Sequence, residues 1–410
     1  MKKLLFIYLI IGVLLGGVVA IAEVARKEVL PPKMVRVAIV RDARELNLNI
    51  SGPYNFIDLD SGKVIGAGRK LVKAKVRLLD KGLFMGTNVY SVKRLVIRPT
   101  KDASVTINSH SFRGDVFLLR TPNNRITAIN SIDIEDYIKG VLYHEVSHHW
   151  AMEALKAQAV ATRTYAIYKM ESSHNADYDV TNDIYSQVYG GKDSERYRTG
   201  LAVDRTAGQI LSFQGKVLPA YFHATCAGMT EDAKDLWGSD IPPLRGVPCM
   251  FCQDSPHMHW KRNYRLHDIQ LKLNKYGHKI GSIKEIKIID RNRSGRVKSL
   301  KIISREGREI IIQGKDFREI IGPNDLKSNN YEITMQGYYV NFVGKGWGHG
   351  VGMCQWGTRG MAEQQFNFKQ ILSYYYPGSE LMDYHDLKKS AWPVLPTKED
   401  PLATSNPAVK

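Results

Sequence analysis

The stretch from Ala151 to Met170 is the feature that most constrains the fold of this chain. It contains neither glycine nor proline, and alanine, leucine, lysine, glutamine, glutamate and methionine dominate it. These residues are the strongest helix formers, so the sequence predicts a long helix here. Its many alanines, among them Ala154, Ala157 and Ala161, leave room for other elements to pack close to it. We therefore expect this helix to be the central element of the soluble part.

A single acid stands shortly before this helix. Glu145 has apolar or aromatic residues on both sides, including Leu142, Val146 and Trp150. A carboxyl group held among apolar side chains tends to have a raised pKa, which suits it to donate a proton near neutral pH. The ordinary alternative is a surface glutamate in a first helical turn, which the helix dipole favours. Glu145 is thus a candidate general acid.

The charge balance favours an anionic partner. The 410 residues include 58 Lys and Arg against 41 Asp and Glu, a formal net charge of +17. Nucleic acid, anionic lipid and acidic cell-wall polymer all fit this sign. No zinc-finger spacing or RNA-binding motif supports nucleic acid, so no nucleic-acid partner is expected. The basic residues are spread along the chain, which is also typical of a solvated surface.

The amino terminus resembles a targeting segment. Met1-Lys2-Lys3 precedes an unbroken apolar run from Leu4 to Ala22, and a polar linker follows at residues 23–34. Such a run is either a signal-peptide core or one membrane-spanning helix, and Ala20-Ile21-Ala22 offers a cleavage site. Its length favours an uncleaved anchor in the cell membrane over secretion. The short basic tail before it predicts that the bulk of the chain lies outside the cytoplasm.

The pattern along the chain predicts an α+β fold, with β-rich segments around a central helical catalytic region and an N-terminal membrane helix. Short β-branched runs between turn signals indicate strands in the first part. The proposed divisions after the anchor at 1–22 and the linker at 23–34 are a β-rich part at 35–131, a catalytic core with a Cys/His loop at 132–260, a mixed insert at 264–343, a glycine-rich loop with a closing helix at 344–384, and a disordered tail at 385–410.

Residues 144–148 read His-Glu-Val-Ser-His, which fits the H-E-x-x-H pattern of zinc peptidases. In those enzymes both histidines lie on one helix face and the glutamate activates metal-bound water. However, Gly140 stands just upstream of a motif that should lie inside a helix, and the helical pattern begins only after Trp150. A zinc peptidase with His144 and His148 as ligands is therefore the less favoured interpretation.

Three of the four cysteines gather in one irregular segment. Cys249 and Cys252 have the short spacing with which two thiolates hold one metal ion. Cys226 and a nearby histidine, His223 or His257, would complete a tetrahedral site that closes a long loop. A disulfide or free buried thiols would fit the same residues outside the cytoplasm.

A glycine-rich segment, Gly-Lys-Gly-Trp-Gly-His-Gly, surrounds Trp347. No strand–helix–strand pattern flanks it, so a phosphate-binding loop is not favoured. Glycine lets a ligand approach the backbone closely. The flat faces of Trp347 and Trp356 suit sugar rings, while His349 and Gln355 offer hydrogen bonds. A tight structural turn is the ordinary alternative, and the isolated Cys354 is expected to be a small packing residue.

Taken together, these segments resemble the stage II sporulation protein D family, whose domain is shared with the amidase enhancer LytB. The matching segments are IEDYIKGVLYHEVSHHWAMEALKAQAVATRTYAI, YFHATCAG, LRGVPCMFC, SGRVKSLKI and GKGWGHGVGMCQWG, in the family's order. The resemblance spans roughly 35–384 and implies a single SpoIID/LytB-like domain. Ala227 and Thr162 depart from the usual residues by small changes that leave the assignment standing.

This resemblance implies a lytic transglycosylase acting on peptidoglycan. Such enzymes cleave the β-1,4 bond between N-acetylmuramic acid and N-acetylglucosamine in strands stripped of stem peptides. The catalytic acid and base would be Glu145, and the sugar's own C6 hydroxyl would attack to give a 1,6-anhydro product. One carboxylate then suffices, whereas hydrolysing glycosidases use two. The likeness to LytB leaves a second interpretation, a non-catalytic wall-binding partner that activates an amidase.

The resemblance also implies which residues line or brace the groove, and which would hold zinc. Its partners would be peptidoglycan glycan strands and another cell-wall enzyme such as an amidase. Relatives in bacteria that make no spores leave the host's biology open. The substrate-binding residues implied are Lys156, Gln158, Arg163, Gln187, Tyr189, His223, Trp347, Gly348, His349, Gln355 and Trp356, and the zinc ligands implied are Cys226, Cys249, Cys252 and His257.

Overall fold

The computed structural model describes residues 33–100, 102–173, 177–183 and 187–387. The expected anchor at 1–22, nearly all of the linker and most of the expected tail lie outside the described residues. Within the described part, no helix combines the length and the apolar character that crossing a bilayer requires. All elements below belong to one compact unit that begins at Met34. The described chain is mixed α+β, as the sequence predicts.

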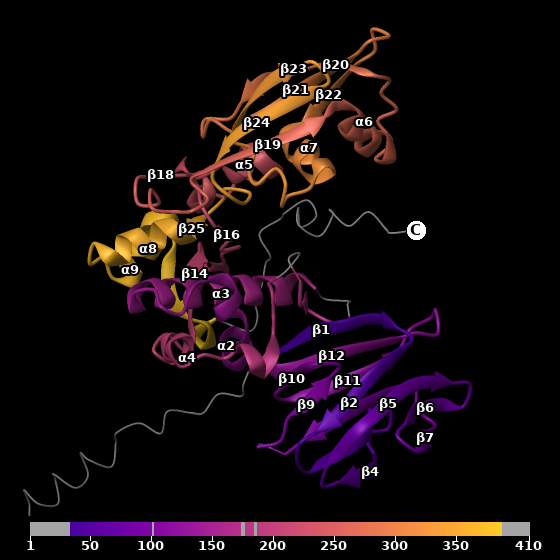
Figure 1. The fold of residues 1–410 in the computed structure, drawn as a ribbon. Helices are drawn as coiled ribbons and strands as arrows, with labels where there is room; N and C mark the ends of the chain where they lie inside the picture. The colour runs from indigo at the N-terminus through magenta and orange to yellow at the C-terminus, as the bar shows by residue number, and fades with distance from the viewer. Residues whose placement is uncertain (1–32, 101, 174–176, 184–186, 388–410) are drawn as a thin grey trace, which may run out of the picture. The chain divides into compact units, whose positions relative to one another are not determined.

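The β-rich segment folds into two sheets that share one hydrophobic cluster (Figure 1). Its strands are β1 (Met34–Ala43), β2 (Glu45–Ile50), β3 (Tyr54–Asp58), β4 (Val64–Gly68), β5 (Leu71–Leu79), β6 (Gly82–Met85), β7 (Asn88–Tyr90), β8 (Arg94–Pro99), β9 (Val105–Ile107), β10 (His110–Phe112), β11 (Asp115–Arg120), β12 (Ile126–Asp133) and β13 (Val180–Thr181). The orders are β13-β1-β12-β11-β8-β3-β4 and β10-β9-β2-β5-β6-β7. Alternating β-branched and apolar side chains fill the space between the sheets, because successive residues of a strand face opposite sides.

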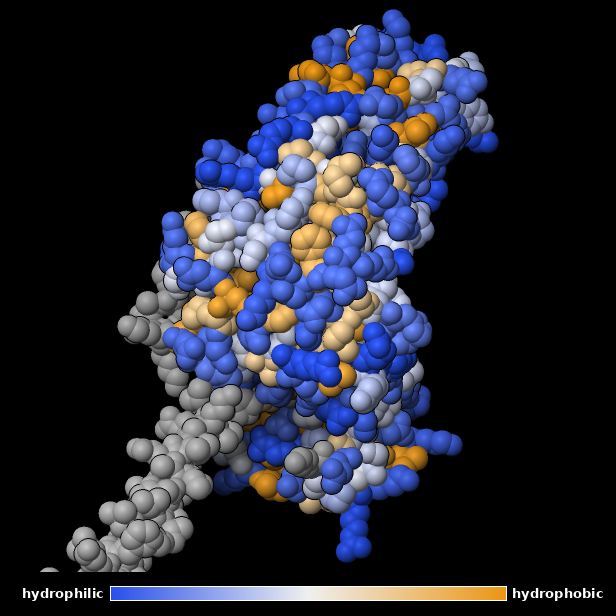
Figure 2. All heavy atoms as spheres, turned by 90° about the vertical axis from the view of Figure 1, so that its left-hand side faces the viewer, coloured by the Kyte–Doolittle hydropathy of each residue, from blue (hydrophilic) through white to orange (hydrophobic). Residues whose placement is uncertain are grey.

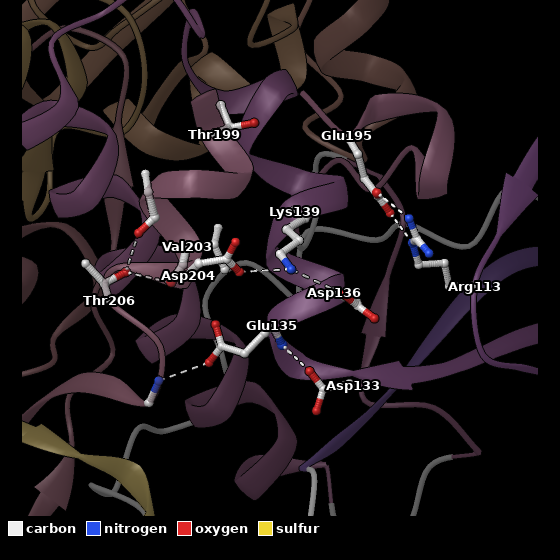
Figure 3. Close-up of polar contacts among 12 residues, drawn as sticks. Arg113, Asp133, Glu135, Asp136, Lys139, Glu195, Thr199, Val203, Asp204 and Thr206 are labelled. Atoms are coloured by element: carbon white, nitrogen blue, oxygen red, sulfur yellow. Dashed lines mark hydrogen bonds and ion pairs between the residues drawn. The ribbon is translucent and has the colours of Figure 1, made fainter. Parts of the chain in front are cut away.

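Helix α2 (Ile134–Glu145) follows β12 directly. The carboxylate of Asp133 caps it by accepting the backbone N–H of Glu135 at 2.9 Å (Figure 3), which satisfies one of the free donors at a helix start. One turn later Lys139 forms an ion pair with Asp204 at 3.0 Å. The cap and this ion pair fix the first half of α2 against its neighbours.

The expectation that helical structure begins only after Trp150 is wrong, because Gly140 lies inside α2. A Cβ at this position would stand 2.5 Å from Cε2 of Tyr189. The glycine therefore serves close packing of α2 against the Tyr189 ring. This contact with a distant residue is invisible in the local sequence.

Helix α3 (Met152–Ser172) confirms the predicted central helix. Nearly every residue from Ala154 to Tyr168 is buried. One side contributes Ala159 and Ala166 to the cluster beneath the sheets, and another contributes Ala157 and other small residues to a second cluster. Small side chains on all sides explain why elements pack around the whole helix.

A buried ion pair joins these two helices. Nη2 of Arg163 on α3 lies 2.6 Å from Oε2 of Glu135 on α2, and the Arg163 side chain has no exposed surface. Arg163 also donates to the carbonyl oxygen of Gln209 at 3.1 Å. Glu135 in turn accepts the N–H of Gly208 at 3.1 Å (Figure 3). The pair thus ties α2, α3 and the chain at 208–209 into one arrangement.

The next elements pack around α2 and α3, and most of those from β14 onward contribute to the second cluster. β14 pairs with β15 and β26, β16 pairs in parallel with β25, and β17 pairs with β18. Their bounds are η1 (Gly191–Ser194), α4 (Tyr197–Asp204), β14 (Gln209–Phe213), β15 (Lys216–Val217), β16 (Phe222–His223), β17 (Gly228–Met229), α5 (Ala233–Trp237), η2 (Pro242–Leu244), β18 (Pro248–Cys249), β25 (Met353–Cys354), α8 (Gln355–Glu363), α9 (Phe368–Tyr375), β26 (Glu380–Asp383) and η3 (Tyr384–Asp386).

The mixed insert expected at 264–343 has a hydrophobic cluster of its own. Two three-stranded sheets, β19-β24-β23 and β20-β21-β22, pack there with two helices (Figure 1). The elements are β19 (His259–Arg265), α6 (Leu266–Lys275), β20 (Ile283–Arg291), β21 (Val297–Ser304), β22 (Glu309–Gln313), α7 (Gly314–Ile321), β23 (Tyr331–Gln336) and β24 (Tyr339–Lys345). Hydrophilic residues cover most of the face drawn in Figure 2, with hydrophobic residues in small groups between them.

We expect Arg163→Leu to lower the free energy of unfolding by about 3–5 kcal/mol, because it leaves the Glu135 carboxylate partly buried without its cation. Urea denaturation followed by circular dichroism measures this loss. The matched control is Lys75→Ala, which breaks an exposed pair with Glu45 and should change stability by less than about 1 kcal/mol. Equal losses in the two variants would contradict the structural role given to the buried pair.

Candidate active site

Glu145 is the last residue of α2, and the chain turns sharply after it. Val146 has φ of −141° and ψ of 152°, so the backbone becomes extended at once. The Glu145 side chain is half-buried and lies where two cavities meet. Nε2 of Gln355, the first residue of α8, donates to Oε2 of Glu145 at 3.3 Å. Two segments far apart in the sequence therefore build the acid's surroundings.

Burial raises the pKa of Glu145 to about 7. The hydrogen bonds from Gln355 and from the backbone of Val188 act in the opposite direction, because they stabilise the carboxylate. Glu145 forms no ion pair within the described part of the chain. The raised pKa that the apolar neighbours predict is confirmed in direction. At neutral pH this carboxyl group is available in both protonation states.

The first cavity is an open groove of about 790 Å³. Three indole rings line it: Trp150, Trp347 and Trp356. Trp150 and Trp356 meet edge to face at a centroid distance of 5.4 Å. Flat aromatic walls beside a polar floor are suited to a sugar polymer, because the rings cover apolar ring faces while polar groups bind hydroxyls. Glu363 also lines the groove, but it is paired with Arg359 at 2.8 Å.

The second cavity, of about 300 Å³, extends from Glu145 toward two histidines. Nδ1 of His223 lies 3.1 Å from the carbonyl oxygen of Val351, while its Nε2 is buried without a hydrogen-bond partner among the described residues. Burial lowers the pKa of His223 well below its usual range, and burial together with Arg318 lowers that of His349 to about 3. Both imidazoles are therefore neutral at physiological pH and place no positive charge beside Glu145.

The glycine-rich segment comes close to the wall that carries His223. A Cβ on Gly348, whose φ is +109°, would stand 2.8 Å from Cβ of His223. A Cβ on Gly352 would stand 2.0 Å from the carbonyl oxygen of Tyr221. Only glycine permits this approach. The turn is both structural and part of the site, since Trp347, Gly348 and His349 line the second cavity.

The predicted substrate-binding residues separate into two groups. Gln187, His223, Trp347, Gly348, His349, Gln355 and Trp356 line one or both cavities. Lys156, Gln158, Arg163 and Tyr189 do not line either cavity, so of the two expected roles, lining and bracing the groove, they are placed for bracing.

Each of these four residues has contacts that brace the scaffold instead. Gln158 and Arg163 have no exposed surface, Lys156 pairs with Glu153 at 2.6 Å, and the Tyr189 hydroxyl donates to Asn130 at 2.8 Å. Most of helix α3 is buried, so the side chains of Gln158 and Arg163 point into protein, whereas Tyr165 of the same helix lines the second cavity.

Several lining residues have no signal in the sequence. Tyr165, Val188 and Tyr221 line the second cavity, and His149 and Arg359 line the groove. His149, Tyr165 and Tyr221 lie inside the family-like segments but were not singled out there, whereas Val188 and Arg359 lie outside them. The five residues come from distant parts of the chain, so only the fold brings them together. The Tyr165 hydroxyl is buried without a hydrogen-bond partner among the described residues, and Tyr165 is one of the residues that line the second cavity.

The H-E-x-x-H pattern does not form a zinc-peptidase site. Helix α2 ends at Glu145, so His144 and His148 do not share a helix face. Nε2 of His144 lies 2.6 Å from the hydroxyl of Ser194. The metal-binding groups found among the described residues do not include either histidine. The extended backbone at Val146 therefore overturns this interpretation.

All four cysteines lie together, with their sulfur atoms within 4.8 Å of one another. The expectation that Cys354 is isolated is therefore wrong, because β25 runs beside β16 and carries it to the other three. His257 is not a member of this group: its ring packs edge to face against Trp347 at 4.3 Å and lines the groove. The cysteines form no disulfide.

The cysteine group fits a metal ion by its donor chemistry. Tetrahedral zinc with thiolates needs sulfur–sulfur distances of about 3.8 Å, given Zn–S bonds of about 2.3 Å. The sulfurs of Cys226 and Cys252 are 3.6 Å apart. The backbone N–H groups of Cys226 and Gly357 both donate to Sγ of Cys354 at 3.3 Å, a contact that favours a thiolate.

Comparison with known proteins identifies the family. The family model described as "Stage II sporulation protein" matches residues 122–213, which hold α2, Glu145 and α3. A stage II sporulation protein D of Bacillus amyloliquefaciens is 30% identical over 302 residues, which cover 70% of this chain and 83% of that protein. The chain belongs to the stage II sporulation protein D family.

Other relatives extend this result along the chain. An uncharacterized protein of Brachyspira hyodysenteriae is 34% identical over 365 residues, which cover 88% of this chain and 96% of that protein. The amidase enhancer of Bacillus subtilis is 28% identical over 293 residues, which cover 60% of this chain and 40% of that protein. A model described as "Domain of unknown function (DUF8618)" matches residues 251–352, the insert and the glycine-rich segment.

We expect Glu145 to titrate at a pH of about 7 and Gln355→Leu to raise this pKa further, because the amide N–H stabilises the carboxylate. Carbon-detected NMR of protein with labelled glutamate measures both values, and the signal lost in Glu145→Gln assigns the resonance. Gln364→Leu, an exposed change at the end of the same helix, is the matched control and should leave the pKa unchanged. A lower pKa in Gln355→Leu would contradict the contact.

Proposed function

We propose that this protein is a peptidoglycan lytic transglycosylase that cleaves the β-1,4 bond between N-acetylmuramic acid and N-acetylglucosamine in denuded glycan strands. A cell-wall-related function is supported by family membership and by the relative named amidase enhancer. The observation that carries the finer proposal is Glu145, a carboxyl group with a pKa of about 7 at the junction of two cavities, one of which is the tryptophan-lined groove.

The number of available acids supports this reaction over hydrolysis. Hydrolysing glycosidases commonly use two carboxylates that flank the bond. Glu363 is the other carboxylate lining the described cavities, and it is engaged in an ion pair with Arg359 at 2.8 Å. A reaction in which the substrate supplies its own nucleophile needs one acid that can also act as base.

In the proposed mechanism, protonated Glu145 donates its proton to the glycosidic oxygen as the bond to C1 of the muramyl residue breaks. The C6 hydroxyl of the same residue then attacks C1, and its proton passes to the Glu145 carboxylate. The products are a 1,6-anhydro end and a free 4-hydroxyl, and the enzyme returns to its starting state. Gln355 orients the carboxyl group through its hydrogen bond at 3.3 Å. An intramolecular nucleophile gains from proximity, and a pKa near the working pH suits both transfers.

We expect Glu145→Gln to fold normally and to lose activity by about 10²–10⁴-fold, because the amide cannot donate or accept the proton. The assay digests denuded glycan with the purified protein and detects anhydromuramyl ends by mass spectrometry. The wild-type rate should fall as pH rises above about 7, since the first step requires protonated Glu145. Turnover retained in the variant would reject the assignment of this residue.

The second candidate is a non-catalytic partner that binds the wall and activates an amidase, which the amidase enhancer relative supports. The same glycan separates the two functions. Binding without anhydromuramyl products, together with stimulation of an added amidase, would favour the activator. Products without any amidase would favour the transglycosylase. An extracytoplasmic location is part of both proposals and is supported by the basic residues and apolar run at 1–22.

We also propose that the four cysteines hold a structural zinc ion, with Cys354 as the fourth ligand in place of His257. Bound zinc would cross-link the irregular loop at 226–252 to β25, and such sites stabilise the folded state. Cys354 precedes Gln355 directly, so these ligands would also hold the residue that contacts Glu145. The reaction itself uses no metal in this proposal.

We expect the purified protein to contain one zinc ion per chain by elemental analysis and to unfold at a lower temperature after chelation, because the metal binds the folded state preferentially. Cys354→Ser should lose the metal, while His257→Ala should retain it, since His257 lies outside the cysteine group. The reverse result would restore His257 as the ligand. A metal-free, equally stable wild type would leave four free buried thiols.

A further inference from the structure

The sheet β19-β24-β23 has one buried face and one exposed face. Trp260, Tyr331 and Phe342 point into the hydrophobic cluster of the insert, together with residues of α6 and α7. Their neighbours along each strand point the other way, because the side chains of a strand alternate. The opposite side is named here the open sheet face, and its residues are His259, Lys261, Asn263, Arg265, Glu332, Thr334, Gln336, Tyr339, Asn341, Val343 and Lys345. Glu332, the one acid among them, is paired with Arg291 at 2.7 Å.

Side-chain amides form a ladder across the open sheet face. Nδ2 of Asn263 on β19 donates to Oδ1 of Asn341 on β24 at 2.6 Å, and Nδ2 of Asn341 donates to Oε1 of Gln336 on β23 at 3.3 Å. Each amide has donor or acceptor capacity beyond these two bonds. Such a row of oriented amides presents hydrogen-bonding groups of both kinds to a polar ligand.

Aromatic and basic side chains flank this ladder. The Tyr339 side chain is 41% exposed and lies opposite Arg265 in the strand register. Lys261 lies one step beyond Asn263 on the same face and is exposed. An exposed aromatic ring, amides and cations on one flat surface suit a sugar polymer that carries carboxylates, since the ring covers C–H faces and the cations pair with the acids.

The two longer strands of this sheet lead away from the groove at Glu145. β19 begins two residues after His257, and β24 ends two residues before Trp347, and both His257 and Trp347 line the groove. The N–H of Gly346 donates to the carbonyl oxygen of His257 at 3.0 Å, which joins the two chain segments at the groove wall. From Lys345 to Tyr339 the strand extends about 20 Å, at about 3.3 Å per residue.

The insert is strongly basic, as is the β-rich part at 35–131 with its 17 Lys and Arg against seven Asp and Glu. Residues 259–345 contain 19 Lys and Arg against nine Asp and Glu, whereas the whole chain has a formal net charge of +17. A surface of this sign attracts and retains an anionic polymer.

We propose that the open sheet face is a second binding surface for the glycan strand that is cleaved at Glu145. The carboxylates of the strand pair with Lys261 and Arg265, its hydroxyl and acetamido groups bind the amide ladder, and Tyr339 packs on a sugar ring. This inference rests on the proposed function for the identity of the polymer. Its consequence is avidity: a long strand bound at the groove and at the sheet is held more tightly than either contact alone would hold it.

The test compares a long strand with a short one on the purified full-length protein. The face variant combines Lys261→Glu, Arg265→Glu and Tyr339→Ala, and the matched control combines Lys284→Glu and Arg308→Glu, two exposed cations on the other sheet and its turn. Binding to long denuded strands is measured by co-sedimentation, and cleavage is measured on a tetrasaccharide. We expect the face variant to bind long strands about tenfold more weakly or worse, with unchanged cleavage of the tetrasaccharide, and the control to match wild type.

Each other outcome decides against a specific part of the inference. Unchanged binding by the face variant, or an equal loss in the control, overturns the sheet as the second surface. Equal binding of poly-glutamate overturns the assignment to glycan, because charge alone would then explain the retention. A folded face variant that also loses cleavage of the tetrasaccharide shows that the face is not separate from the groove. Binding of long strands by a wild type that cleaves nothing refutes the proposed function and leaves this surface standing.

Tyr339→Ser alone, with no change of charge, should give a smaller loss of binding to long strands in the same direction.

Discussion

The buried pair of Arg163 and Glu135 is the contact on which the arrangement of the site depends. A guanidinium with no exposed surface is stable only when a carboxylate and carbonyl oxygens surround it. Here those partners come from α2 and from Gln209, so the pair fixes α2 against α3 at its first turn. The backbone hydrogen bonds of a helix keep its two ends in a fixed relation. Fixing the start of α2 therefore also positions its last residue, Glu145.

The environment of Glu145 balances two opposing effects. Burial raises its pKa, while hydrogen bonds from Gln355 and the backbone of Val188 lower it. Neutral His223 and His349 add polar atoms without adding positive charge. The carboxyl group still reaches the groove, so a ligand can exchange protons with it. A more exposed glutamate would have an ordinary pKa and would be ionised at neutral pH. A cation paired with the carboxylate would lower the pKa further and so prevent protonation.

The strand pair β16 and β25 links the two chemical features of the molecule. His223 lies on β16, and Cys354 lies opposite it on β25. The next residue, Gln355, turns into α8 and contacts Glu145, whereas Cys354 joins the other cysteines. The cysteine group and the acid therefore share one short stretch of backbone. A change in the geometry of the cysteines is expected to reach Glu145 through Gln355.

The sequence by itself determined the features that depend on neighbouring residues. Helix α3 follows from helix propensity over Ala151–Met170, the β-rich part follows from β-branched runs, and the raised pKa of Glu145 follows from its apolar neighbours. The family resemblance also predicted Trp347, His349 and Gln355 as site residues, and all three line the cavities. These signals come either from neighbouring residues or from long segments that resemble the family in the same order. They can therefore be recognised without knowing how the chain packs.

Only the tertiary structure decided which distant residues meet. Gly140 looked like a helix breaker, yet Tyr189 packs where its side chain would be. Arg163 looked like a cation for substrate, yet it pairs with Glu135 in the interior. Cys354 looked isolated, yet parallel pairing of β25 with β16 carries it to the other cysteines. The physical reason is common to all three: each side chain's role is set by a partner that close packing delivers from far along the chain, and local propensity carries no information about that partner.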